Sequence, residues 1–121
     1  MINLKIFLFS ALLLIVSQQG FSQTAEVGMA SFYSDKLHGK STASGEPYDK
    51  IKMTAAHRTL PFNTKIRVTN LDNNKSVIVT VNDRGPFVKG RIVDVSRAAA
   101  VKLGFINKGL TKVKLEVLED D

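Results

Sequence analysis

The chain has 121 residues, a formal net charge of +6 and no cysteine, and this length predicts a single domain. The lack of cysteine excludes disulfide bonds and structural thiolate metal sites, and two histidines are few for a zinc site. The basic residues are scattered, so we expect no nucleic-acid partner and a general attraction to an anionic polymer.

The first 22 residues have the layout of a secretory signal peptide. Lys5 precedes an uncharged apolar run over 6–16, and the residues of 17–22 provide a cleavage site after Ser22. The apolar run is well short of the roughly 20 residues that span a bilayer. We therefore expect an exported, soluble protein without a stable membrane anchor, in which residues 23–26 form a short leader.

Short alternating runs follow the leader. We expect a strand over 27–33 and then an irregular segment over 34–64, whose length is typical of a functional loop. Residues 65–70 and 76–82 alternate on either side of the polar turn 71–75. This pattern predicts a β-hairpin.

The C-terminal part predicts further strands and a short helix. Residues 91–95 read as a strand, and Ser96 is placed to cap a helix over 97–103 that Gly104 ends. A last alternating strand begins at Leu110.

Several short strands with one short helix indicate a mainly β domain over 27–118. We expect it to close into a small barrel, because the edges of so small a sheet would otherwise need protection. An acidic tail over 119–121 follows the domain.

Five residues on loops and strand ends carry groups suited to acid–base chemistry: Glu46, Asp49, His57, Asp83 and Asp94. An acid beside apolar groups, as in the Asp94 segment, could protonate a glycosidic oxygen. Each of the five also has a structural interpretation, such as an aspartate paired with an arginine or a turn residue. Tyr33 and Tyr48 could stack on sugar rings.

Long motifs in a fixed order resemble the RlpA (rare lipoprotein A) family from about Val27 to Leu118. They are GMASFY, HGKSTASGEPYD, TAAHRTLPFNT, VTNLDNNKSV and VNDRGPFVKGRIVDVSRAAAVKLG. The resemblance implies a six-stranded double-psi β-barrel, like that of expansins, with one or two short helices. It also implies an endolytic lytic transglycosylase that cleaves MurNAc–GlcNAc bonds of denuded peptidoglycan strands and leaves 1,6-anhydromuramic ends, without cofactor or metal.

The resemblance assigns roles to particular residues. Asp83 is the leading acid and base, with Asp94 close behind, and His57 and Glu46 complete the catalytic set. The expected substrate-binding residues are Ser31, Tyr33, Ser44, Tyr48, Asp49, Thr54 and Arg84.

The chain departs from the resemblance in two ways, because it has no lipobox cysteine and no further domain after the barrel. We therefore expect a soluble, unanchored monomer in the periplasm or outside the cell. Two other functions remain open at this point. One is a non-catalytic, expansin-like module that binds or loosens peptidoglycan, and the other is a hydrolase of a different β-glycan.

Overall fold

The computed structural model describes residues 25–119. The expected signal peptide over 1–22, the first residues of the leader (23–24) and the end of the acidic tail (120–121) lie outside the described residues. The elements within the described range are, in chain order, β1 (Ala25–Phe32), the 3-10 helix η1 (Asp35–Leu37), β2 (Thr54–Ala56), β3 (Lys65–Asn70), β4 (Ser76–Asp83), β5 (Arg91–Val95), α2 (Arg97–Leu103) and β6 (Thr111–Leu118).

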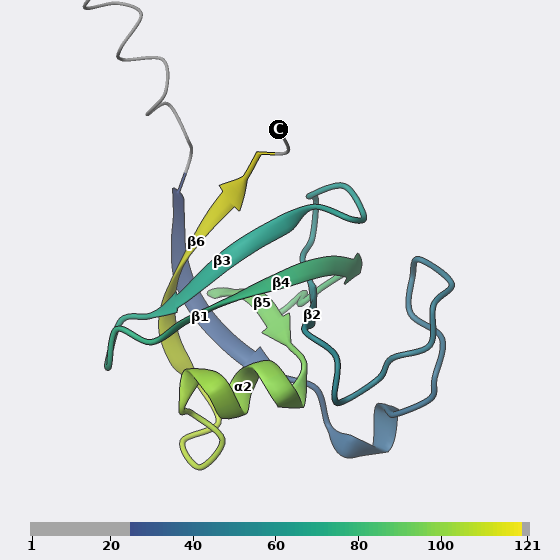
Figure 1. Cartoon of the computed structure of the whole chain (residues 1–121), viewed down its shortest axis with the longest axis horizontal. Helices are drawn as coiled ribbons and strands as arrows, with labels where there is room; N and C mark the ends of the chain where they lie inside the picture. The colour runs from purple at the N-terminus through teal and green to yellow at the C-terminus, as the bar shows by residue number, and fades with distance from the viewer. Residues whose placement is uncertain (1–24, 120–121) are drawn as a thin grey trace, which may run out of the picture.

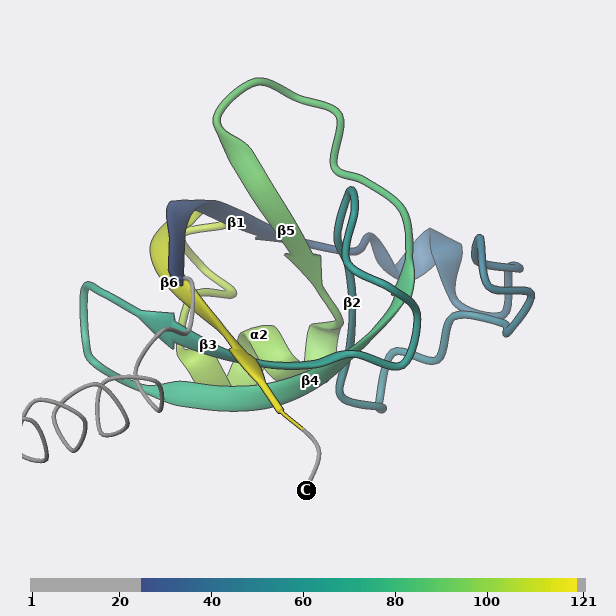
Figure 2. The same ribbon diagram turned by 90° about the horizontal axis from the view of Figure 1, so that it is seen from above.

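The six strands close into a barrel in the order β1-β5-β2-β4-β3-β6 (Figures 1 and 2). Strands β1 and β5 are parallel, and so are β2 and β4. The other four neighbouring pairs are antiparallel. The predicted mainly β, six-stranded barrel with short helices is therefore confirmed.

Alternating apolar residues fill the barrel, as the sequence pattern predicts. The largest fully buried apolar side chains of the core come from these strands and from residues at and just after the end of α2: Phe105, Ile66, Leu103, Val68, Val79, Val81, Val93, Val95 and Val113. Helix α2 lies across one end of the barrel and buries Ala99, Ala100 and Leu103 (Figure 1). The core thus occupies the barrel interior and the space beneath α2.

The boundaries of α2 agree with the prediction. The side chain of Ser96 accepts a hydrogen bond from the backbone N–H of Ala99 at 3.2 Å, as an N-cap residue does. Gly104 ends the helix in the left-handed conformation, with φ of 77°. The capping signals in the sequence were therefore sufficient to place this helix.

Two strands differ from the expectation. β1 begins at Ala25, so Ala25 and Glu26 belong to the first strand rather than to a leader. β2 lies inside the segment that was predicted to be an irregular loop. The prediction missed this strand because three residues are too few to show an alternating pattern. It is nevertheless paired on both sides, to β4 and to β5. The irregular segment between Tyr33 and β2, residues 34–53, lies beside the barrel and is called the long loop below (Figures 1 and 2).

Candidate active site

Four neighbouring strands align polar residues in one row. Ser31 of β1 is in register with Asp94 of β5, and Asp94 is in register with Ala56 of β2. Ala56 is in turn in register with Asp83 of β4. Residues in register across a sheet point to the same face. We call Ser31, Asp94, Ala56 and Asp83 the acid row.

Ser31, Ala56 and Asp94 of the acid row lie on the outer face of the barrel, because their chain neighbours point inward. Ala30, Ala55, Val93 and Val95 have no exposed surface and belong to the core. The register shifts once in each parallel pair. β5 has the extra residue Ile92 opposite the step from Met29 to Ala30, and β4 has the extra residue Asn82 opposite the step from Ala55 to Ala56. Such bulges re-aim side chains next to functional sites. The bulge at Asn82 directly precedes Asp83 and brings it to the same face as Ala56, although Val81, two residues earlier, belongs to the core.

The Asp83 carboxylate is held by donors from three segments. The Tyr33 hydroxyl donates to Oδ2 at 2.5 Å. The backbone N–H groups of Ala43 and Arg84 donate to Oδ1 at 2.8 and 2.9 Å. Burial and the hydrogen bond to Asp83 raise the pKa of Tyr33 far above its ordinary value, so the phenol remains protonated and continues to donate. Asp94 accepts a hydrogen bond from the Ser31 hydroxyl.

Tyr33 and Tyr48 form a wall next to the acid row. Their rings stack with centroids 4.3 Å apart and planes 15° apart, and they pack with Ala56 in a small cluster separate from the core. The Tyr48 hydroxyl accepts a hydrogen bond from the N–H of Arg97 at 3.1 Å. The two rings are 9% and 2% exposed. They are therefore stacked on each other rather than open to a sugar ring, contrary to the expectation.

A hollow of about 150 Å³ adjoins the acid row at Asn82, the neighbour of Asp83. Its lining residues are Glu46, Pro47, Asp49, Lys52, Thr54 and Asn82. The Asn82 amide donates to Glu46 Oε1 at 3.4 Å. The structure thus brings Glu46, Asp49 and Thr54 together at a hollow beside the acids.

Ser44 holds the long loop against β4 instead of facing the hollow. Its backbone N–H donates to the carbonyl of Asn82 at 3.2 Å, and its hydroxyl accepts from the N–H of Glu46 at 3.3 Å. Asp49 likewise uses Oδ1 to accept from the N–H of Ile51 at 3.1 Å. These contacts fix the shape of the loop around the hollow.

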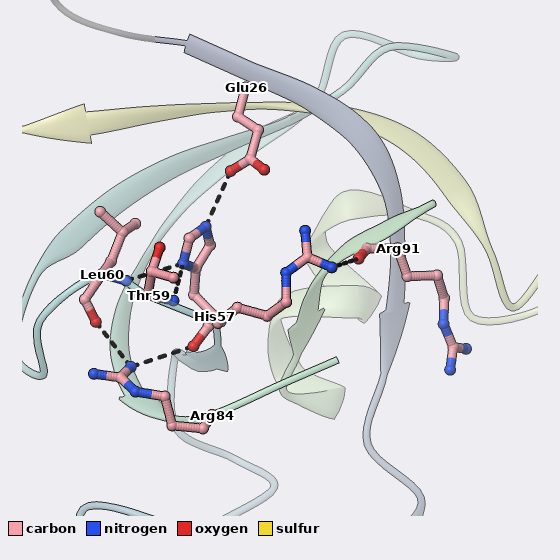
Figure 3. A network of polar contacts seen from close by, with 7 residues as sticks. Glu26, His57, Thr59, Leu60, Arg84 and Arg91 are labelled. Carbon is pink, nitrogen blue, oxygen red and sulfur yellow. Dashed lines mark hydrogen bonds and ion pairs between the residues drawn. The ribbon is translucent and has the colours of Figure 1, made fainter. Parts of the chain in front are cut away.

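The structure does not bring the His57 ring into the acid row. His57 follows Ala56 directly, and its ring contacts Glu26, Thr59 and Leu60 (Figure 3). It is 6% exposed and lines a separate hollow of about 200 Å³. Because β2 was not recognised from the sequence, the face on which His57 lies could not be predicted.

Arg84 is also directed away from the acids. Its Nη1 donates to the carbonyls of His57 and Leu60 at 3.2 and 2.8 Å. The guanidinium lies over the ring of Phe62, 4.1 Å from the ring centroid. The side chain expected to bind substrate therefore braces the segment 57–62, while its backbone N–H contacts Asp83.

Three contributors to the site were not predicted. The N–H of Ala43 contacts Asp83, Asn82 links that acid's strand to Glu46, and Glu26 contacts the His57 ring. Of these three residues, only Asn82 could have been suspected from the sequence, because it adjoins the candidate acid Asp83.

Among residues 25–119, no group of three or more His, Cys, Asp or Glu is placed to hold a metal ion. No helix in that range is long and apolar enough to cross a membrane.

Solved structures with this fold include the Streptomyces papain inhibitor, with a TM-score of 0.65 and 22% identity over 79% of this chain and 96% of that chain. The apo expansin of Clavibacter michiganensis gives a TM-score of 0.63 and 24% identity over 81% of this chain and 52% of that chain. At these identities the likeness concerns the fold alone, and it agrees with the expected expansin-like barrel.

Sequence relatives are closer. The endolytic peptidoglycan transglycosylase RlpA of Pseudomonas aeruginosa (strain UCBPP-PA14) is 58% identical over 93 residues, which cover 77% of this chain and 27% of that protein. The protein of the same name from Vibrio cholerae is 49% identical over 108 residues, covering 89% of this chain and 40% of that protein. The chain thus spans between about a quarter and two fifths of these relatives. A family model described as lytic transglycolase matches residues 25–115. The chain therefore belongs to the RlpA family of lytic transglycolases.

Proposed function

We propose that the protein is an endolytic transglycosylase that cuts the bond between N-acetylmuramic acid and N-acetylglucosamine in peptidoglycan strands. The observation that carries this proposal is the acid row, in which two carboxyl groups flank the small residue Ala56 on one face of the barrel. The RlpA relatives are endolytic peptidoglycan transglycosylases by name, which supports the same activity.

Asp83 is the general acid and base of this reaction. Its protonated carboxyl transfers a proton to the glycosidic oxygen as the bond to C1 of the muramic residue breaks. The C6 hydroxyl of that residue attacks C1 to form a 1,6-anhydro ring, and its proton passes to Asp83. The nucleophile is part of the substrate, so proximity favours it and no water molecule is consumed.

Asp94 and the hollow bind the glycan on either side of Asp83. Asp94, held by Ser31, stabilises the positive charge that develops on the sugar ring. Glu46, Asp49 and Thr54 bind the neighbouring sugar in the hollow. Two carboxylates there repel the acidic groups of a stem peptide, which favours denuded strands. The protein acts as an exported monomer that needs no metal or cofactor.

Amidase-treated sacculi, incubated with the purified protein and analysed by mass spectrometry, test the proposal. Anhydro-ended fragments, one water lighter than hydrolytic ones, are the expected product. Binding without new ends would indicate an expansin-like module, and fragments that contain added water would indicate a hydrolase.

Asp83→Asn tests the assignment of the acid. We expect turnover to fall at least ~100-fold, the usual contribution of a proton-transfer group, with the folded state retained. Asp72→Asn is the matched control, because Asp72 is an exposed acid paired with Lys108 and lies outside the acid row. Normal anhydro-product formation by Asp83→Asn would show that Asp83 is not the acid.

A further inference from the structure

A set of hydrogen bonds links Glu26, near the start of β1, through His57 and Leu60 to Arg84, the residue after Asp83 (Figure 3). Glu26 Oε1 lies 3.0 Å from Nε2 of the His57 ring. Nδ1 of that ring accepts from the N–H groups of Thr59 and Leu60 at 3.2 and 3.1 Å. Since Nδ1 acts as an acceptor, the geometry assigns the ring proton to Nε2, which donates to Glu26.

The same segment holds Asp83 through its backbone. The carbonyls of His57 and Leu60 accept from Arg84, whose own N–H donates to the Asp83 carboxylate at 2.9 Å. The N–H of His57 donates to the carbonyl of Asp83 at 3.1 Å. The segment that the His57 ring organises thus holds the main chain of Asp83 directly and its carboxylate through Arg84.

We propose that Glu26 is a positioning residue for the catalytic acid and acts through His57 and Arg84. The inference rests on the proposed function of Asp83. His57 is buried, so loss of Glu26 leaves its Nε2–H without a partner, which is costly enough to make the ring turn. A turned ring releases the N–H groups of Thr59 and Leu60 and, with them, the carbonyls that hold Arg84.

The exposure of Glu26 makes this role separable from folding. Its side chain is 44% exposed, whereas the His57 side chain is 8% exposed. Glu26 therefore adds little to the core, and replacing it removes a hydrogen-bond acceptor rather than packing.

Three variants separate the hydrogen bond from the charge. We expect Glu26→Ala to lower kcat roughly tenfold or more with KM little changed, since a misplacement of about 1 Å can cost ~100-fold. Glu26→Asp keeps the charge but is too short to reach the ring, so it should behave like Glu26→Ala. Glu26→Gln keeps an acceptor oxygen at full length and should retain most of the activity.

Glu116→Ala is the matched control. Glu116 lies on β6 in register with Ala25, its side chain is 34% exposed, and it pairs with Lys114 at 3.7 Å. It has the same chemistry on the adjacent strand but no contact with His57, so kcat should be unchanged. A fall in kcat equal to that of Glu26→Ala would overturn the proposal, because the effect would then be one of surface charge.

NMR gives a readout that does not require activity. In Glu26→Ala and Glu26→Asp we expect the ring ¹⁵N shifts of His57 to lose the single-tautomer pattern, and the amide signals of Arg84 and Ala43 to move. Wild-type kcat together with wild-type amide signals in both variants would overturn the inference.

If Glu26→Ala does not fold, Glu26→Asp must still be less active than Glu26→Gln, and the reverse order would refute the inference. An inactive wild-type protein would refute the proposed function, while the amide signals would still test the positioning role.

Discussion

The two faces of the strands β1, β5 and β2 have opposite compositions. The inner face carries Ala30, Val93 and Ala55, which have no exposed surface. One residue further along each strand, the outer face carries Ser31, Asp94 and Ala56 of the acid row. Because side chains alternate along a strand, the barrel core and the candidate site share the same backbone and differ by one position.

This comparison explains why the site is rigid. The core residues fix the strands, and the strands fix the spacing of the acids across Ala56. On β4, the bulge at Asn82 brings Asp83 to the face of Ala56. The two faces should therefore respond differently to the same substitution.

The largest difference is expected for a carboxylate moved by one residue. Val93→Asp buries an unpaired charge in the core and should cost more than about 4 kcal/mol of a typical stability of about 5–15 kcal/mol. Asp94→Asn on the outer face should leave stability almost unchanged while it weakens activity. Urea unfolding of both variants measures this, and a cooperatively folded Val93→Asp protein of wild-type stability would contradict the assigned faces.

A smaller difference is expected for the adjacent alanines of β2. Ala55→Val overfills the core and should destabilise the protein by about 1–3 kcal/mol. Ala56 is 2% exposed and packs with Tyr33 and Tyr48. Ala56→Val should push these rings aside and lower kcat/KM by roughly tenfold, because the Tyr33 hydroxyl is displaced from Asp83. Unfolding and product-release assays on both variants separate the effects. Full activity of Ala56→Val would show that the position of the Tyr33 ring does not matter for the reaction.

The smallest effect concerns Tyr33 and appears only in alkali. Its pKa is raised above the ordinary value of 10.0 in the folded protein, so unfolded chains release this proton first. The free energy of unfolding should therefore fall as the pH rises above 10, by at most about 1.4 kcal/mol per pH unit for this one group. Tyr33→Phe should show a shallower fall in urea unfolding on either side of pH 10. Identical slopes would mean that Tyr33 is not held as a protonated donor.

The sequence was sufficient wherever local chemistry determines local structure. The cap at Ser96 and the left-handed Gly104 placed α2, and the alternation of residues 65–70 and 76–82 placed the hairpin. In contrast, β2 is stabilised by its neighbours on both sides rather than by a pattern of its own. The presence of β2 could therefore be recognised only from the family resemblance or from the structure.

The candidate site was predictable in its membership but not in its arrangement. Asp83 and Asp94 could be nominated from their positions at strand ends, yet only the register of β2 shows that Ala56 separates them. The face on which His57 lies depends on the same register. Nothing in the sequence pointed to Glu26, because its proposed role depends on contact with His57, which lies 31 positions away.

The long loop gives Asp83 one of its donors, through Ala43, but its buried residue Tyr48 packs outside the barrel core. The surroundings of the acid are thus shaped by a segment whose composition the barrel hardly constrains. Substitutions or insertions near Ala43 can alter catalysis at little cost to folding. The protein therefore combines a barrel scaffold with a loop whose substitutions can adjust the activity proposed for Asp83.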